Sequence, residues 1–555
     1  MPSASEKELR APVPRAHLLC LLLIFLGQAA ANYIWLQSDR QPPLWDMALH
    51  QSIGLRYGDI YVGNDNPGTG GWWAVSGAYP PLYHHLLAAA FLLGRDSDAA
   101  TLANVPATLL LIFGTYLLGR RWFSAPTGLL AALLLVCFPY MAWISRETVI
   151  DYTMAALVLW TLIALEASEG FSRKGASLWT GVLLAGCALT KWIAPFFLAL
   201  PVLMARCRKM PEVDRQADNA AGSAGAESFA PVLHPRTVNL VDAILAAGGI
   251  SLLWYFPKLP EIMDFLRRNT AVGAAEGEPP VFSLQSLVYY LRLAEGQQLH
   301  LLFSAMALAG FLYAWFHHRE SFFKILGWIA SGYVVLTLLR TKDPRFSLPL
   351  LPALAVLAVC WIEGIRPSLP RRLSYAFFAA AAIGSFLLAS FGCRYLPREI
   401  LLAEGYQGSF RWDWKLYSQD YFGLLGAPSE VPWPQQEILE RVGTSLPGNR
   451  RGKLALVPDF PRFNHENLRL AALLAKRPIE VLRLGSLHGG GEEALQQSDF
   501  ILVSESGQGM EWSTRGSREV TQYILDRPER FTVDSFYTLP DGIHLRLYRR
   551  KEPAR

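Results

Sequence analysis

Stretches of about 17 to 21 residues with little or no charge recur along most of the chain, and they constrain its fold more than any other feature. A helix of about 20 apolar residues crosses the hydrocarbon core of a bilayer with its backbone polar groups satisfied. The sequence therefore predicts an α-helical polytopic membrane protein with about eleven transmembrane helices. We place them at 16–36, 99–119, 125–143, 149–167, 175–190, 192–207, 237–256, 298–316, 323–340, 347–363 and 373–392.

The composition agrees with this assignment. Hydrophobic residues make up 52% of the 555-residue chain and mean hydropathy is +0.22, which is more apolar than ordinary soluble proteins. The formal net charge is +5 and no long run of Lys and Arg occurs, so nothing indicates a nucleic-acid partner. The six cysteines form no CxxC motif and no Cys/His pair, which argues against a zinc site.

The basic residues occur in short clusters between the apolar stretches, as expected of cytoplasmic loops. With the N-terminus inside, the clusters all fall on the inner side, at 7–15, 120–121, 173–174, 206–236, 319–324 and 366–372. The segment 80–94 carries His84 and His85 and is short for a span, so we expect an interfacial helix there. As a span, it would invert the sidedness of every later loop. We therefore expect a multi-pass protein of the cell (inner) membrane with a cytoplasmic N-terminus.

Four regions follow from this topology. Residues 1–207 form an N-terminal transmembrane catalytic module with a first outer loop at 37–98, 208–236 a cytoplasmic linker, 237–392 a second transmembrane module and 393–555 an exported domain. Further outer loops lie at 144–148, 257–297 and 341–346. The last region carries β-like runs at 454–458, 479–484 and 500–504 between helical stretches, so we expect a soluble α/β domain there.

Two carboxylates on the outer side are candidate site residues. Asp46 follows Pro42-Pro43-Leu44-Trp45 and is either the N-cap of a helix or a catalytic group. Asp151 stands at the edge of a membrane helix, where a carboxylate is costly unless it has a partner or a task. Arg146 could be that partner in a structural salt bridge.

Three cations, Lys191, Lys342 and Arg345, lie at helix ends on the same side. One lysine at an interface could merely extend to water, but three cations together break the charge bias of the outer face. Cations can neutralise a phosphate leaving group, while a carboxylate orients or deprotonates an acceptor hydroxyl. These groups therefore fit chemistry on a lipid-linked phosphate.

Five short motifs carry a family resemblance. They are Trp45-Asp46, Tyr79-Pro80-Pro81-Leu82-Tyr83, Ser145-Arg146 with Asp151, Thr190-Lys191, and Arg345-Phe346-Ser347-Leu348-Pro349 with Pro352. Their order and common sidedness resemble the multi-spanning glycosyltransferases that include protein O-mannosyltransferases and the lipid A aminoarabinose transferase. The match is spread over much of 16–363. The sequence departs from the family at Met47, where an acidic residue is usual, and at Ala78-Tyr79, where an acidic-basic pair stands in the aminoarabinose enzyme.

The resemblance implies an inverting transferase that moves a sugar from a polyprenyl-phosphate donor to a hydroxyl of a glycolipid, glycan or protein acceptor on the outer (periplasmic) face. Asp46 would act at the acceptor and Asp151 would support the site. The lipid phosphate would face Arg146, Lys191, Lys342 and Arg345.

No cofactor is assigned from the sequence, and a divalent metal is left open. Glu276 and Glu278 with His84 or His85 would form its site; alternatively, they are ordinary solvated loop residues. The C-terminal region shows no catalytic constellation, and we attribute His465-Glu466 to loop composition.

Two other functions compete with transfer. A transporter or flippase of lipid-linked saccharides would also need apolar helices with buried ions, but it predicts inverted repeats and broken helices in two matching halves. A non-catalytic membrane scaffold would have no use for Asp151 at a helix edge. One-sided charges and a long first outer loop favour the transferase.

Overall fold

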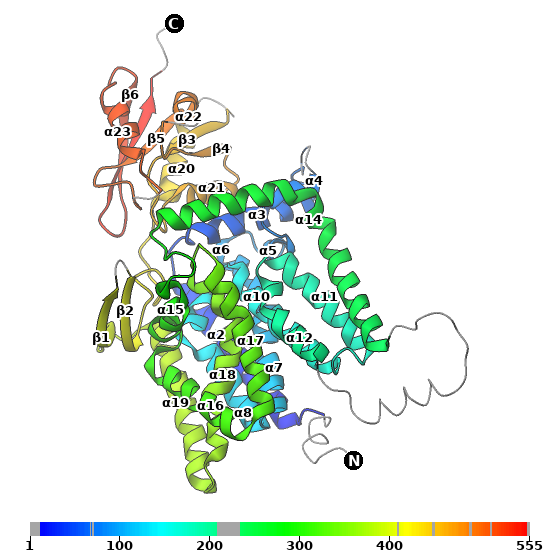
Figure 1. Cartoon of the computed structure of the whole chain (residues 1–555). Coiled ribbons are helices and arrows are strands. Elements are labelled where there is room, and N and C mark those ends of the chain that lie inside the picture. Colours follow the sequence, from blue (N-terminus) through cyan, green and yellow to red (C-terminus); the bar gives the residue numbers. More distant parts are fainter. Residues whose placement is uncertain are drawn as a thin grey trace, which may run out of the picture.

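The structure, a computed structural model, describes residues 12–66, 68, 71–207, 234–407, 410–446, 450–487, 491–510 and 513–551. Residues 208–233 of the predicted linker and the basic residues before Ala11 lie outside this range. The described chain forms a bundle of long helices with a small mixed α/β domain at one end (Figure 1). The predicted fold class is therefore confirmed.

A helix occupies the position of each predicted span. These helices are α2 (Arg15–Ser38), α7 (Val105–Trp122), α8 (Ala125–Cys137), α10 (Ile150–Ala167), α11 (Lys174–Thr190), α12 (Ala199–Cys207), α14 (Pro235–Ala275), α16 (His300–His317), α17 (Arg319–Leu338), α18 (Leu351–Cys360) and α19 (Ser368–Phe391). By length and composition, 8 helical segments of the described chain can cross a membrane, and two shorter apolar helices, Ala125–Cys137 and Ala194–Cys207, accompany them.

The first outer region folds into short helices above the bundle. They are α3 (Trp45–Tyr61), α4 (Gly71–Val75), α5 (Leu82–Phe91), α6 (Ser97–Ala100) and the 3₁₀ turn η1 (Thr101–Asn104). With 10 residues, α5 is only about 15 Å long, so segment 80–94 does not span a bilayer. It packs so closely on α3 that a Cβ at Gly54 would lie 2.4 Å from Leu87 Cβ.

The predicted outer loop 257–297 is largely helical, which corrects the sequence analysis. Helix α14 continues for 41 residues with Pro257 and Pro260 inside it, and α15 (Leu284–Leu293) follows. A proline lacks the N–H donor and clashes with the preceding turn, so it bends a helix. Beyond the prolines, α14 changes direction (Figure 1), and it contacts α4 of the first outer region. Its charged side chains form short-range pairs within the helix, such as Lys258–Glu261 (2.5 Å).

The C-terminal domain contains a five-stranded sheet in the order β4-β3-β5-β7-β6. Strands β3 (Gly452–Leu456), β4 (Ile479–Arg483) and β5 (Phe500–Ser504) are parallel and match the predicted runs, whereas β6 (Phe531–Thr538) and β7 (His544–Arg550) are antiparallel. Helices α20 (Gln435–Thr444), α21 (His465–Leu474), α22 (Gly491–Gln497) and α23 (Ser517–Leu525) complete it. The sequence analysis missed the preceding hairpin of β1 (Glu399–Gln407) and β2 (Phe410–Ser418).

This domain is fixed to the helical bundle through α21, which packs on α3. Polar side chains, three of them buried, bind backbone carbonyls across the junction, so the domain has a defined position. The contacts are Trp35 Nε1 to Gly426 O (2.9 Å), Arg462 Nη1 to Pro42 O (2.7 Å), Arg95 Nη2 to Leu473 O (3.1 Å) and Asn467 Nδ2 to Pro43 O.

The predicted inner loops meet at the opposite end of the bundle (Figure 1). Glu166 pairs with Arg121 (3.4 Å) and with Lys324 (3.1 Å), and Ser321 donates to Trp122 O (2.7 Å). Three loops far apart in sequence are thus gathered at one end, as the predicted sidedness requires. That this end is cytoplasmic stays a prediction.

Candidate active site

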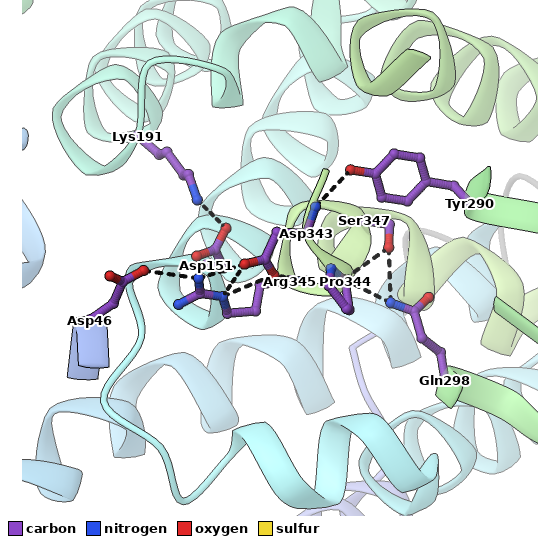
Figure 2. A network of polar contacts seen from close by, with 9 residues as sticks. All are labelled: Asp46, Asp151, Lys191, Tyr290, Gln298, Asp343, Pro344, Arg345 and Ser347. Carbon is purple, nitrogen blue, oxygen red and sulfur yellow. Dashed lines mark hydrogen bonds and ion pairs between the residues drawn. The ribbon is translucent and has the colours of Figure 1, made fainter. Parts of the chain in front are cut away.

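Asp46 meets Arg345 across the two transmembrane modules. Asp46 lies in the first turn of α3, and its Oδ2 accepts a hydrogen bond from Arg345 Nη2 at 2.9 Å (Figure 2). The N-cap position belongs to Leu44, which has no capping side chain, so the interpretation of Asp46 as N-cap is wrong. The Asp46 side chain remains 44% exposed and open to a ligand.

Asp343 holds the Arg345 guanidinium in place. It caps the 3₁₀ turn η4 (Pro344–Leu350) by accepting from Arg345 N at 2.8 Å, and it also accepts from Arg345 Nε (2.9 Å) and Nη2 (2.5 Å). Such a two-pronged pair fixes both distance and orientation. Arg345 Nη1 makes no hydrogen bond to any residue that the structure describes. Asp343 was given no role from the sequence.

Asp151 and Lys191 form a buried pair behind Arg345 (Figure 2). Asp151 lies in the first turn of α10, and its Oδ1 is 2.6 Å from Lys191 Nζ, just beyond the end of α11. The Lys191 side chain is only 12% exposed and its Nζ lies 4.0 Å from the centre of the Phe346 ring. Lys191 therefore does not extend to water, and it takes the place that the salt-bridge alternative gave to Arg146.

Lys342 points away from this network. Its Nζ donates to Leu336 O (2.7 Å) and Thr337 O (3.0 Å), carbonyls at the C-terminal end of α17 that lack partners within the helix. Burial lowers the pKa of Lys342 to about 8. The structure thus gives this residue a helix-capping contact and does not bring it to Asp46.

Arg146 lies in a different cavity. Its guanidinium stacks over Trp35 at 4.7 Å, and neither Nη1 nor Nη2 has a hydrogen-bond partner within the described ranges. Burial lowers the pKa of Arg146 to about 9. The cavity beside it, about 380 Å³, is lined by α2, η1 and α7 and includes Gln28 and Asn104. Four of the six predicted residues therefore lie together, and two lie apart. The first set is Asp46, Asp151, Lys191 and Arg345; the second is Arg146 and Lys342.

A cavity of about 560 Å³ opens beside Asp46 and Arg345, between the bundle and the C-terminal domain. The membrane module contributes charged and aromatic side chains to it, namely Trp45, Asp46, Tyr140, Glu276, Asp343 and Arg345, and Tyr421 comes from the segment between β2 and α20. The domain contributes Asp459, His465, Glu466, Arg483 and Met510. The attribution of His465-Glu466 to loop composition is therefore wrong: both begin α21 and line the cavity.

The predicted metal ligands are not brought together. His84 Nε2 lies 3.1 Å from His50 Nδ1, and His85 contacts Tyr61 at 2.5 Å, while Glu276 lines the cavity beside Asp46. Within the part of the chain that the structure describes, no three His, Cys, Asp or Glu side chains are placed to hold one ion. Burial and the nearby Glu276 and Asp343 raise the pKa of Glu278 to about 8. We derive no chemistry through a metal.

Comparison with known proteins agrees with this architecture. Residues 78–208 match the family model of dolichyl-phosphate-mannose-protein mannosyltransferases. The structure of ArnT from Cupriavidus metallidurans in the apo state aligns with a TM-score of 0.56 and 14% identity, over 95% of this chain and 97% of that one. Its structure bound to undecaprenyl phosphate gives a TM-score of 0.56 and 12% identity, with the same coverage, 95% and 97%.

A third structure, the Archaeoglobus fulgidus oligosaccharyltransferase with Zn and sulfate, aligns with a TM-score of 0.50 and 11% identity, over 95% of this chain and 72% of that one. No curated protein sequence matches the chain. The chain therefore has the fold of the multi-spanning glycosyltransferases, and the family resemblance predicted from its sequence motifs is confirmed.

Proposed function

We propose that the protein is an inverting glycosyltransferase that moves a sugar from a polyprenyl-phosphate donor to an acceptor hydroxyl in the cavity beside Asp46. The observation that carries this proposal is the 2.9 Å pair of Asp46 and Arg345 at the wall of a 560 Å³ cavity. A carboxylate and a guanidinium from segments 299 residues apart meet at this wall, and we propose that a membrane lipid and an exported acceptor both reach it. The undecaprenyl phosphate bound by ArnT supports a polyprenyl-phosphate donor.

The pair can divide the chemistry between its two groups. Asp46 Oδ2 is held by Arg345, while Oδ1 makes no hydrogen bond to a described residue and can take the proton of the acceptor hydroxyl. The acceptor oxygen then forms a bond to the anomeric carbon while the bond between that carbon and the phosphate oxygen breaks. Arg345 Nη1 stabilises the departing phosphate anion. Attack from the face opposite the phosphate inverts the anomeric configuration.

Asp151 and Lys191 lie behind Arg345 and support its position. Asp151 at 2.6 Å neutralises Lys191 in part, and the buried pair fixes the position of Phe346 next to Arg345. Of the four cations predicted to face phosphate, we retain Arg345, because Lys191 pairs with Asp151 behind it and does not line the cavity. We assign Lys342 to helix capping, and Arg146 to the separate cavity.

The reaction is proposed to take place on the outer face. The basic loops and the cavity lie at opposite ends of the bundle, so cytoplasmic loops would leave the cavity outside. A reporter fused after Lys209 is expected to be cytoplasmic, and one fused after Gly426 exported. A cytoplasmic signal at Gly426 would contradict this sidedness.

The proposal is tested with purified membranes and a labelled polyprenyl-phosphate sugar. We expect sugar to pass from this donor to acceptor or, without acceptor, slowly to water. Mass spectrometry of the purified protein should detect an isoprenoid phosphate. Transport of the intact lipid-linked sugar without cleavage of the sugar–phosphate bond would favour the flippase instead.

A further inference from the structure

The carboxyl ends of the parallel strands in the C-terminal domain open toward the cavity. From the central strand β3, the chain passes to β4 on one side and then to β5 on the other. In open α/β sheets, ligands bind outside the carboxyl ends of the strands, where the strand order reverses in this way. Asp459 follows β3 by three residues and Arg483 ends β4, and both line the cavity.

A hydrogen bond attaches this edge of the domain to the residue that precedes Asp46. Asp459 Oδ1 accepts from the indole nitrogen of Trp45, the neighbour of Asp46, at 3.0 Å. Asp459 Oδ2 lies 3.2 Å from Arg483 Nη2. The segment after β5 packs against Asp459: a Cβ at Gly509 would lie 2.2 Å from Asp459 O. The crevice and the reaction site are therefore parts of one rigid cavity.

The domain side of the cavity offers mainly hydrogen-bond acceptors. Glu466 lies in the first turn of α21, and its Oε2 is buried and has no hydrogen-bond partner among the residues described. The nearest cation to that oxygen is Arg469, with 3.8 Å between Nη1 and Oε2. An unmatched buried carboxylate oxygen is costly unless a ligand donates to it. Arg483 is the principal donor on this side.

Aromatic rings also line the cavity. Trp45 and Tyr140 come from the membrane module, and Tyr421 from the segment between β2 and α20. A sugar ring presents apolar C–H faces that pack on aromatic rings and a rim of hydroxyls that donate to carboxylates and accept from guanidinium groups. A volume of about 560 Å³ is within the range of small-ligand sites. A peptide acceptor, unlike a sugar, would offer only its one reacting hydroxyl to the carboxylates of this cavity.

We propose that the acceptor is a saccharide, and that Arg483, Asp459 and Glu466 of the C-terminal domain bind its hydroxyls while Asp46 faces the one that reacts. This inference rests on the proposed glycosyl transfer and adds the acceptor class and the residues that select it. The C-terminal domain is thus a specificity element of the enzyme.

The test separates acceptor binding from donor use. The probes are methyl glycosides and short oligosaccharides, compared with Ser- and Thr-containing peptides, each offered with labelled polyprenyl-phosphate sugar to the full-length protein. For Arg483→Ala and for Glu466→Gln, we expect the acceptor KM to rise about 10-fold or more, because each variant loses one hydrogen bond between a charged group and the acceptor. Hydrolysis of the donor without acceptor should change by a smaller factor than the acceptor KM. Arg477→Ala is the matched control, because this arginine of the same domain pairs with Glu440 at 3.6 Å and does not line the cavity.

Each outcome decides the inference. Transfer to saccharides with a raised acceptor KM in the two variants supports it. Transfer to peptides alone, transfer to none of the saccharides, or an unchanged acceptor KM in both variants overturns it. A wild-type protein that neither transfers nor hydrolyses the donor would overturn the proposed function itself, and this inference with it.

Discussion

The two ends of the helical bundle each carry ion pairs and a large cavity, yet they differ in how those features are built. At the inner end, a cavity of about 590 Å³ is lined mainly by apolar residues. Lys324 pairs there with Glu320, one helical turn away, at 3.1 Å and with Glu166, from another helix, also at 3.1 Å. At the site end, the cavity is slightly smaller, about 560 Å³. There, Arg345 and Asp46 are 299 residues apart in sequence, and a second domain forms one wall.

The difference shows that cavity volume does not identify the functional end. Long-range ion pairs do not identify it either, because the inner cavity also holds one, Lys324 with Glu166. The two ends differ in what surrounds the charges. We therefore assign function to the end where a carboxylate open to a ligand, aromatic rings and a second domain meet.

The largest expected effect is that of Asp46→Asn. The amide keeps the shape of the side chain but cannot take a proton, so sugar transfer should fall about 10²–10⁴-fold, the usual contribution of a general base. The rate is measured with labelled donor in membranes, with expression and insertion as controls. A near-normal rate would end the assignment of Asp46 as the catalytic carboxylate.

Substituting one cation at each end sharpens the comparison. Arg345→Gln removes the charge that faces the leaving phosphate, and transfer should fall about 10²–10³-fold. Lys324→Gln removes a cation from the inner cavity and should leave the rate unchanged. Both variants are assayed at saturating donor after matching protein amounts; equal losses would mean that the two ends cannot be distinguished by function.

Arg146→Gln tests the division among the predicted phosphate-facing cations. Because Arg146 lines a separate cavity, donor turnover should fall less than 10-fold, far less than in Arg345→Gln. Steady-state kinetics on the donor measures both variants. A loss as large as that of Arg345→Gln would show that the phosphate reaches Arg146 after all.

The smallest expected effect concerns stability and pH. His50 lies in α3, outside the membrane-spanning helices, and burial with the nearby Arg345 and Lys191 lowers its pKa from 6.5 to about 3. Below pH 6.5, His50 binds a proton in the unfolded chain but stays neutral in the native state. Stability should therefore fall as pH decreases from 6.5 toward 3, by up to about 1.4 kcal/mol per pH unit from this group.

Thermal unfolding in detergent across this pH range measures the slope. His50→Gln should flatten it, whereas the exposed control His544→Gln should not. An unchanged slope in His50→Gln would contradict a neutral His50 in the folded protein.

The sequence predicted the features that depend on local composition. Apolar length located the helices, and the run 500–504 coincides with β5, because burial on both faces requires a continuous apolar strand. It also predicted Asp46, Asp151, Lys191 and Arg345 as site residues, although it proposed Arg146 as a partner of Asp151. The outer half of α14 was missed, because its polar surface lacks the apolar signal of a span.

The contribution of the C-terminal domain could not be predicted. Trp45 and Asp459 meet at 3.0 Å although they are 414 residues apart, and no local pattern specifies such a contact. Likewise, Asp343 was visible as a neighbour of Arg345, but only the fold shows that it fixes the guanidinium toward Asp46.

Photo-cross-linking tests most directly which end of the molecule holds the donor. A photoreactive polyprenyl-phosphate sugar analogue is bound to the wild-type protein, and the labelled peptides are mapped by mass spectrometry, with excess unlabelled donor as competitor. We predict competed labelling of peptides that contain Tyr140, Glu276 or Tyr421 around the Asp46–Arg345 cavity. Competed labelling confined to Leu162, Met204 or Phe323 in the inner cavity would contradict the account.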